Sequence, residues 1–360
     1  MSTRRTIRLA TRGSDLALRQ AAGVKERLET RRVEVELREV ETTGDRIQDE
    51  LIHRLGKTGA FVRSLDQEVL DGTVDGAVHS MKDMPTDSPP ELVVAGIPER
   101  AAPGDVLVTP DGQALEDLDP GSVVGTSSLR RKAQLRSVRP DLSTEPLRGN
   151  VDTRLEKLLA PTLQREHERL LKEESEGDNG PVEAWFEDLA EIERQALERR
   201  PDTEYDAIVL AAAGLDRAGL ASQVETYDLP RSSFVPAPGQ GAIAVTARKG
   251  SDESEVINDG VDHPRTRVET TTERVVLSEL GGGCVAPIGV HAVVRGEHVH
   301  VEAAVFGSEG EREVTGTRDL PVEEYPEAAR AFADDLRERG AADLITEARV
   351  DVEDREAKRE

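Results

Sequence analysis

Short apolar runs alternate with segments of helical periodicity from the N-terminus to Lys249. Apolar residues in succession or at every second position predict strands at 6–11, 33–41, 75–79, 92–97, 123–126, 206–211 and 242–247. Between these runs, apolar residues recur at helical spacing in two sets: Ala17, Ala21, Val24 and Leu28, behind Ser14 as the helix cap, and Phe61, Leu65 and Val69. Alternating strands and helices predict an α/β architecture with parallel sheets and ligands at the carboxyl ends of the strands.

The pattern changes after Lys249. A helix is expected near 265–280, strands near 288–295, 298–306 and 312–317, and a helix from 322 to about 339. This order predicts a smaller α+β domain with an antiparallel sheet.

Residues 161–204 have the composition of an insertion. They contain fourteen acidic and six basic residues, and a Gly-Asp-Asn-Gly-Pro break at 177–181. One expected helix has Trp185, Leu189, Ile192 and Ala196 on one face. The segment holds no catalytic constellation and predicts a solvated surface hairpin of helices.

The charge of the chain limits its ligands. The formal net charge is −25, and the basic residues are thirty-nine arginines and eight lysines. An acidic surface stays hydrated in concentrated salt and indicates a salt-adapted source. The negative charge also argues against nucleic acid as the main partner, because a protein needs a basic face to bind nucleic acid. An anionic ligand must therefore meet a local concentration of arginine.

The chain shows no targeting or membrane signal. Residues 1–13 have no apolar run before a small-residue cleavage site, and no segment approaches the ~20 apolar residues of a membrane span. We expect a cytoplasmic protein. The single cysteine, Cys284, excludes an internal disulfide and is therefore structural, redox-active between chains, or chemically used.

Polar side chains follow two of the expected strands in the first part of the chain. In the segment 9–21, Arg12 and Ser14 stand where a strand meets a helix N-terminus, which favours anions. An ordinary strand-to-helix junction explains that segment equally well. In the segment 77–85, Ser80, Lys82 and Asp83 follow a strand, and Asp83 could offer a carboxylate to a developing cation or relay a proton. His79 is more typical of a core or hinge position.

A third polar segment combines hydroxyls with arginines. Thr126, Ser127 and Ser128 stand between a strand and a helix, where hydroxyls and backbone amides bind oxyanions. Four arginines follow closely: Arg130, Arg131, Arg148 and Arg154. Because the guanidinium fork suits carboxylates, this concentration predicts a ligand with several of them.

The cysteine lies in the segment LGGGCVAPIG, 280–289. Three glycines remove side chains in front of Cys284 and permit unusual backbone angles, so the loop can bring the thiol close to another domain or a bulky ligand. No histidine or second cysteine is near in sequence, which argues against zinc or a local Cys–His pair; no metal is expected. The alternative is a small buried apolar residue.

Together these segments resemble the hydroxymethylbilane synthase family, also called porphobilinogen deaminase. Seven motifs stand in the family's order, from about Arg8 to Ala292 apart from 161–204: ATRGS, GAFVRSLDQEVLDGTVDGAVHSMKDMP, VGTSSLRRKAQL, LRGNVDTRL, YDAIVLAAAGLDRAGL, PAPGQGAIAV and GGGCVAPIG.

The resemblance implies three domains. Two α/β domains similar to the halves of a periplasmic binding protein flank the catalytic cleft, and a smaller α+β domain carries the cysteine loop. Domain 1 is discontinuous, 1–98 and 232–248, so that PAPGQGAIAV completes its sheet; domain 2 is 99–231, and domain 3 is 249–360.

The resemblance also implies an activity, that of a transferase. A dipyrromethane cofactor is joined by a thioether to Cys284 and primes the condensation of four porphobilinogen molecules, with loss of ammonia, before hydrolysis releases a linear tetrapyrrole. Asp83 is the catalytic carboxylate that stabilises positive charge on the ring nitrogens. Because each ring brings two carboxylates, many cofactor and substrate contacts are basic or polar; the matching residues are Arg12, Ser14, Phe61, Ser80, Lys82, Thr126, Ser127, Ser128, Arg130, Arg131, Arg148, Arg154 and Arg217. We expect a monomer that uses neither nucleic acid nor a membrane.

Two positions depart from the family pattern. Thr58 stands where the family often has lysine, with Lys57 before it, and Arg63 replaces a later lysine, which changes the hydrogen-bond geometry.

Two other functions fit parts of the sequence. A two-lobed fold also serves non-enzymatic anion-binding proteins of the periplasmic type, against which the missing signal peptide and the GGGC segment count. A thiol nucleophile for acyl transfer would need a base for Cys284, and the sequence identifies none.

Overall fold

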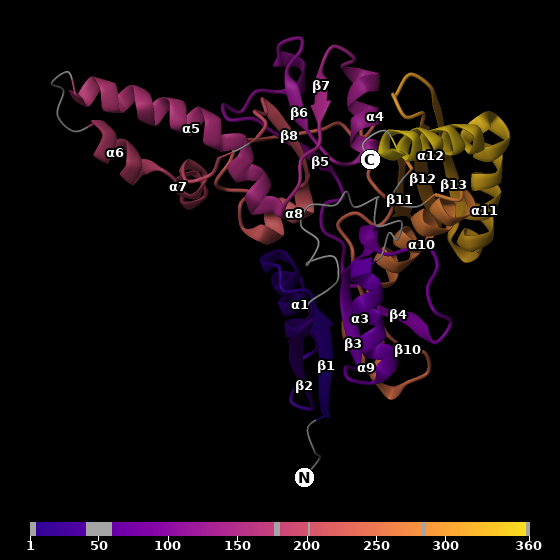
Figure 1. Ribbon diagram of the computed structural model, residues 1–360. Coiled ribbons are helices and arrows are strands. Elements are labelled where there is room, and N and C mark those ends of the chain that lie inside the picture. Colours follow the sequence, from indigo (N-terminus) through magenta and orange to yellow (C-terminus); the bar gives the residue numbers. More distant parts are fainter. Residues whose placement is uncertain (1–4, 41–59, 176–180, 201, 283–285, 358–360) are drawn as a thin grey trace.

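The computed structural model describes residues 5–40, 60–175, 181–200, 202–282 and 286–357. Within them the strands form three sheets. Figure 1 shows the first sheet at the base of the molecule, the second above it, and the third beside both. The α/β architecture expected from the sequence is confirmed.

The first sheet has the strand order β2-β1-β3-β10-β4. Its strands are β1 (Arg5–Thr11), β2 (Val33–Glu39), β3 (Gly76–Ser80), β4 (Leu92–Gly96) and β10 (Ile243–Arg248). β1 runs parallel to β2 and β3, whereas β10 runs antiparallel to both of its neighbours. The sheet is therefore mixed, and not wholly parallel as alternation alone predicted, because a distant segment returns to fill the place between β3 and β4.

Helices cover both faces of this sheet. They are α1 (Asp15–Leu28), α3 (Ala60–Asp71) and α9 (Asp252–Val261). Val24 of α1 and Ile257 of α9 share a core cluster with Ile7 of β1, whereas Leu65 of α3 packs in a separate cluster with Ala77 of β3. Ser14 stands at the N-cap of α1, as predicted, but its side chain makes no capping hydrogen bond.

The second sheet repeats the same plan, with the order β7-β6-β8-β5-β9. Its strands are β5 (Asp105–Val108), β6 (Val123–Gly125), β7 (Ser143–Glu145), β8 (Ala207–Ala211) and β9 (Thr226–Asp228). β6 is parallel to β7 and β8, and β5 is antiparallel to β8 and β9. The helices of this part are α4 (Leu129–Val138), α5 (Val151–Ser175), α6 (Pro181–Asp188), α7 (Glu191–Leu197) and α8 (Ala212–Ala218). Leu135 of α4 packs on one side of the sheet, and Leu155 of α5 packs on the other.

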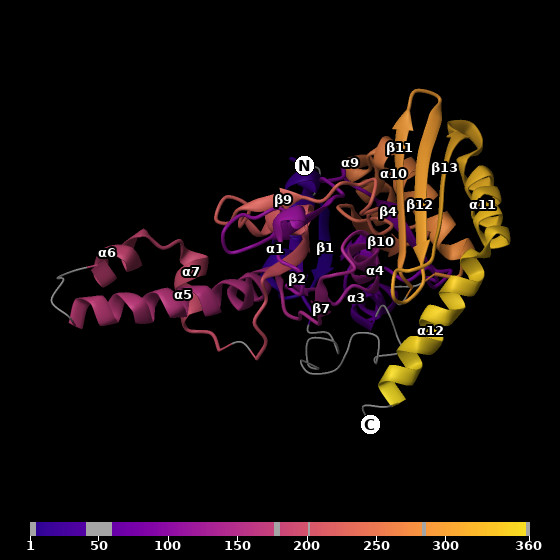
Figure 2. The ribbon, with the colours of Figure 1, turned by 90° about the horizontal axis from the view of Figure 1, so that it is seen from above.

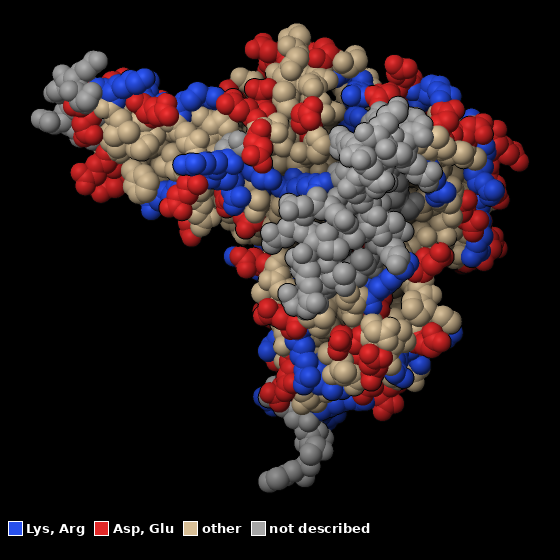
Figure 3. Space-filling view, viewed as in Figure 1, with Lys and Arg blue, Asp and Glu red and all other residues tan. Residues whose placement is uncertain are grey.

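The predicted insertion is a helical arm that projects from the second sheet (Figures 1 and 2). α5 is 25 residues long and continues through Pro161, and α6 and α7 fold back along it. His167 of α5 stacks on Trp185 of α6, with ring centroids 5.8 Å apart. The single helix predicted around Trp185 is wrong: the chain breaks between α6 and α7, where the Ala190 N–H donates to the Glu193 carboxylate at 2.8 Å and starts a new helix. On the face shown in Figure 3, acidic and basic side chains are interspersed over the arm.

The third sheet is antiparallel, as predicted, with the order β11-β12-β13. Its elements are β11 (Ile288–Arg295), β12 (His298–Phe306), β13 (Glu313–Pro321), α10 (Pro264–Glu279), α11 (Tyr325–Leu336) and α12 (Ala342–Ala357). Val276 of α10 and Phe332 of α11 pack in one cluster with the strands. The predicted helix 322–339 consists of a 3₁₀ turn (Val322–Glu324), α11 and a π-helical turn that begins at Arg337. Gly340, whose φ of 100° suits only glycine, then separates it from the unpredicted α12.

Candidate active site

A cavity of about 640 Å³ lies where the three parts of the chain meet. Its walls include the loop after β3, the start of α4, the segment before β10, the end of α10 and one residue of α12. Six cations line it: Arg63, Lys82, Arg130, Arg131, Arg154 and Arg349. Two carboxylates, Asp83 and Asp87, also line it. The wall is therefore basic in a strongly acidic protein.

Asp83 stands in the wall on a short 3₁₀ turn, Met81–Asp83, directly after β3. Met81 is buried and its N–H donates to the Ala242 carbonyl at 3.1 Å, so the turn is fastened to the segment that leads into β10. The guanidinium of Arg274, on α10, donates to the carbonyls of Met81, Met84 and Pro85 at 3.4, 3.3 and 2.6 Å. These contacts fix the loop that carries Asp83, and sequence reasoning missed Arg274 because its partners are distant in the chain.

Hydroxyl side chains shape the start of α4. Ser128 is the N-cap and accepts a hydrogen bond from the Arg131 N–H at 3.4 Å, and Thr126 accepts one from the Ser128 N–H at 3.2 Å. Ser127 donates to the Leu147 carbonyl at 2.7 Å. Ser127 and Ser128 line the cavity at a helix N-terminus, where a negative charge is favoured.

A buried carboxylate stands behind two of the arginines. Asp105, at the start of β5, accepts hydrogen bonds from Arg131 Nε and Nη2 at 3.1 and 2.7 Å, and pairs with Arg130 Nη2 at 2.8 Å. All three side chains are buried. Burial opposes ionisation of Asp105, but the charges of Arg130 and Arg131 hold its pKa below the usual range. Asp105 thereby aligns both guanidinium groups at the cavity wall, a role that sequence reasoning missed.

Two further cations of the wall carry perturbed pKa values. Burial lowers the pKa of the Arg154 guanidinium to about 10, with a further contribution from the charge of Arg131. Burial also lowers the pKa of the Lys82 ammonium, against the opposing charge of Asp83. Burial therefore destabilises the charged form of both groups, and an anionic ligand in the cavity would stabilise that form.

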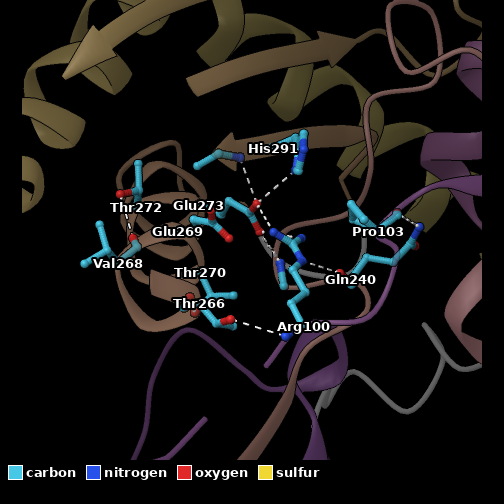
Figure 4. A network of polar contacts seen from close by, with 12 residues as sticks. Arg100, Pro103, Gln240, Thr266, Val268, Glu269, Thr270, Thr272, Glu273 and His291 are labelled. Atoms are coloured by element: carbon cyan, nitrogen blue, oxygen red, sulfur yellow. Dashed lines mark hydrogen bonds and ion pairs between the residues drawn. The ribbon is translucent and has the colours of Figure 1, made fainter. Parts of the chain in front are cut away.

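A polar network connects α10 with this wall (Figure 4). Buried Glu273 accepts hydrogen bonds from Arg100 Nη1 and from the Gly239 N–H, both at 2.7 Å. Arg100 Nε donates to the Gln240 carbonyl at 2.8 Å, and Gln240 Nε2 donates to Asp105 Oδ1 at 2.9 Å. Burial opposes ionisation of Glu273, but the charge of Arg100 and the contact with His291 lower its pKa. The network ties the helix in front of the cysteine loop to the arginine wall.

The predicted residues fall into three groups. Seven line the cavity together: Lys82, Asp83, Ser127, Ser128, Arg130, Arg131 and Arg154. Six are described by the structure but stand outside that lining: Arg12, Ser14, Ser80, Thr126, Arg148 and Arg217. Arg217 donates to the Gly241 carbonyl at 2.7 Å. Cys284, Lys57, Thr58 and the side chain of Phe61 lie outside the described residues, whereas Arg63 lines the cavity.

His79 has a structural environment. Its side chain is buried, and Nε2 lies 2.9 Å from Asp66 Oδ1 and 3.1 Å from Thr246 Oγ1. Thr246 also donates to Asp66 at 2.7 Å. This closed cluster agrees with the core reading of His79.

Comparison with known families decides the identity of the fold and its site. The model of the dipyrromethane-cofactor-binding domain of porphobilinogen deaminase matches residues 7–165 and 192–256, and the model of the C-terminal domain of that enzyme matches 268–337. The chain belongs to the porphobilinogen deaminase family. The gap at 166–191 falls in the helical arm, so the porphobilinogen deaminase model leaves that part of the arm unmatched.

Relatives of this porphobilinogen deaminase family member are similar over nearly their whole length. A probable porphobilinogen deaminase of Halobacterium salinarum is 53% identical over 96% of this chain and 99% of that protein. One of Methanococcoides burtonii is 38% identical, covering 94% and 96%, and the porphobilinogen deaminase of Syntrophomonas wolfei is 37% identical, covering 96% and 99%. Among solved structures, a periplasmic substrate-binding protein of an ABC transporter from Coxiella burnetii is 13% identical over 72% of this chain and 94% of that chain, with a TM-score of 0.36.

The cavity fits the cofactor of the porphobilinogen deaminase family in charge and in place. A dipyrromethane carries two carboxylates on each of its two rings, and the six cations of the wall exceed its four carboxylates. The described residues on either side of 283–285 also border the cavity, namely Gly281, Gly282 and Ala286. A group attached within that segment would start at the cavity wall.

No helix among the described residues combines the length and apolar character that crossing a membrane requires.

Proposed function

We propose that this chain is a hydroxymethylbilane synthase. It joins four porphobilinogen molecules head to tail onto a dipyrromethane that Cys284 holds through a thioether, with loss of ammonia, and releases the linear tetrapyrrole by hydrolysis. The observation that carries the proposal is one cavity bordered by Asp83, by a basic wall and by both sides of the segment that contains Cys284.

The arginines of the wall bind and orient carboxylates. Arg130 and Arg131 are pre-aligned by Asp105, so their geometry is fixed before a ligand arrives. A bound carboxylate stabilises the charged forms of Arg154 and Lys82, which burial disfavours. We assign Arg12, Ser14, Phe61, Ser80, Thr126, Arg148 and Arg217 to the same ligand through the family motifs that they match.

Asp83 acts on the charge that develops during the reaction. Loss of ammonia from porphobilinogen leaves positive charge on the pyrrole nitrogen, and a fixed carboxylate at that place lowers the energy of this charge. The contacts of Arg274 and Met81 hold the Asp83 turn in position, so little reorganisation is needed. The dipyrromethane, when bound, supplies the pyrrole carbon that attacks the activated substrate.

In this proposal the chain divides into three domains: 1–98 with 232–261, then 99–231, then 262–360, whereas the sequence alone placed the last boundary at 248. Because α9 packs on the first sheet through Ile257 and Val261, we place the last boundary after Val261. We further propose that the protein acts as a cytoplasmic monomer without nucleic acid. All walls of the cavity come from one chain, and the net charge of −25 disfavours phosphate backbones.

Intact mass tests the function. The purified protein should carry a covalent increment equal to a dipyrromethane and give a colour with an acidic aldehyde reagent for pyrroles. Cys284→Ser should lose both. A native protein with neither increment nor colour, or a C284S variant that keeps them, contradicts the proposal.

A further inference from the structure

The C-terminal helix α12 brings one arginine to the active-site cavity. Arg349 lines the cavity with Asp83 and the arginine wall, although α12 begins after residue 337, where the family match ends. Figure 2 shows α12 continuing past the end of the third sheet. None of the seven matched motifs extends into this helix.

Packing fixes the position of α12. Leu344, Ile345 and Ala348 are buried, and the first two belong to the core cluster of the third sheet. Arg349 follows Ala348 directly and stands one turn after Ile345, at the edge of the buried face. Its side chain is exposed, so the guanidinium extends from an anchored helix into the space of the cavity.

Arg349 contacts the start of the cysteine segment. Its Nη2 donates to the Gly281 carbonyl. Gly281 has a left-handed φ of 69° and ends α10, with the Gly281 N–H bound to the Ser278 carbonyl and the Gly282 N–H bound to the Leu277 carbonyl, both at 2.9 Å. The N–H groups thus face back to the helix, and the Gly281 carbonyl faces Arg349.

Among the residues whose side chains the structure describes, which in α12 end at Val350, no carboxylate pairs with the remaining donors of Arg349. A guanidinium has five N–H donors, and one contact to a carbonyl leaves a fork suited to a carboxylate. The other five cations of the cavity come from residues 63–154, and only Arg349 comes from the part of the chain that also carries Gly281 and Gly282.

We propose that Arg349 is a positioning residue that holds the start of the cysteine segment and binds a carboxylate of the chain attached there. The inference rests on the proposed function for its ligand, but the contact with Gly281 is independent of that function. Because packing anchors Arg349 beside Gly281, the rings nearest the attachment point are the ones that it is placed to meet. Arg349 therefore selects for a carboxylate on the rings nearest the attachment point.

Three variants test the proposal: Arg349→Ala, Arg349→Lys and the control Arg312→Ala. Arg312, which precedes β13, pairs with Glu347 of α12 but does not line the cavity. Its removal therefore perturbs α12 at the surface alone. Arg349→Lys keeps the charge and loses the fork.

The first measurement is hydrogen exchange of the peptide at the end of α10, Gly281 and Gly282 included, in proteins that also carry Cys284→Ser. We expect exchange to become about tenfold faster in R349A and to stay at the parent rate in R312A. Equal exchange rates in R349A and the parent would show that Arg349 does not hold Gly281 in place. This readout needs no cofactor and no activity.

The second measurement is intact mass after limiting porphobilinogen is added to the holoprotein. We expect R349A to carry a smaller share of cofactor-loaded protein and to accumulate the earliest extended species several-fold, with R349K intermediate and R312A like the parent. If R349A carries as much cofactor as the parent and the same extended species, Arg349 does not bind a carboxylate of the attached chain. If the parent protein itself carries no pyrrole adduct, the proposed function fails, and the exchange experiment still decides the contact.

Discussion

The carboxylate of Asp105 is bound on one side by Arg131 at 2.7 Å and on the other by Arg130 at 2.8 Å, with no part of the trio open to solvent beyond a few per cent. Two positive charges therefore share one buried negative charge at the wall of the cavity. Such a cluster is stable only while the shared charge is present.

Asp105→Asn should destabilise the fold strongly. The change keeps the shape of the side chain but leaves two guanidinium charges buried without a counterion, which costs about 3–5 kcal/mol. Urea unfolding measures the loss. The matched control is Asp141→Asn, which removes a surface partner of Arg139 and should leave the midpoint unchanged.

The same residue predicts an acid limb of stability. The folded-state pKa of Asp105 is lowered, so its stabilisation is complete above its ordinary pKa of about 4 and is lost as the pH falls below that value. The difference in unfolding free energy between parent and D105N should therefore shrink below about pH 4. A difference that stays constant down to the acid transition contradicts this account.

Asp83→Asn should separate cofactor attachment from turnover. The amide cannot stabilise a developing positive charge as the carboxylate does, so kcat should fall by about 10²–10³, the usual effect of removing one electrostatic stabiliser. Intact mass should still show the loaded protein. Near-normal turnover would remove Asp83 from its assigned role.

Arg274→Ala should act on the reaction through the Asp83 loop. Loss of three carbonyl contacts releases the turn, so kcat should fall by about tenfold or more while KM changes little. Arg274→Lys should restore part of the rate. Arg267→Ala on the same helix, which contacts Asp262 and the carbonyls of Val94 and Ala95, is the control and should keep the parent kcat.

Arg154 predicts an alkaline limit on substrate binding. Its pKa is lowered by burial to about 10, and only the protonated form binds a carboxylate. The value of kcat/KM should fall about tenfold per pH unit above about pH 10. Arg154→Gln should lower kcat/KM at pH 8 and flatten this limb. Because the pKa of Lys82 is also lowered, Lys82→Gln is measured in parallel, and the assignment to Arg154 is wrong if that variant loses the limb instead.

Salt should stabilise the protein. The chain has 72 acidic and 47 basic residues, and salt shortens the range of repulsion between exposed carboxylates from about 10 Å at 0.1 M to about 3 Å at 1 M. The thermal midpoint and the turnover rate should both rise over this range with potassium chloride. A protein that is equally folded and active in dilute buffer would contradict salt adaptation.

Sequence reasoning succeeded where the signal is local. The period-two runs located β1, β3, β8 and β10 to within two residues, and polar residues at strand ends located Asp83, Ser127 and Ser128 in one wall. The helical arm was also visible, because its charge and its Gly-Pro break stand together in the chain.

The missed features depend on contacts between distant segments. Arg274 meets the Asp83 loop across 189 or more positions, and Arg349 meets Gly281 across 68, so neither residue has a local pattern. In the sequence, Asp105 is only the first residue of a short strand, and its contact with Arg131 is visible only in the fold. Ser14 occupies the predicted cap position without making the predicted bond, since position follows from the backbone and the bond depends on the side-chain rotamer.

The place of β10 between β3 and β4 has a consequence for synthesis. The whole second sheet, from β5 to β9, is encoded between β4 and β10. The ribosome makes the chain from the N-terminus, so every strand of the second sheet is synthesised before β10. Until β10 is made, the edges of β3 and β4 that pair with it stay unpaired. The later-encoded sheet can thus close before the earlier one. A nascent chain that stalls before Ile243 exposes two open strand edges, which makes it a target for chaperones and for aggregation.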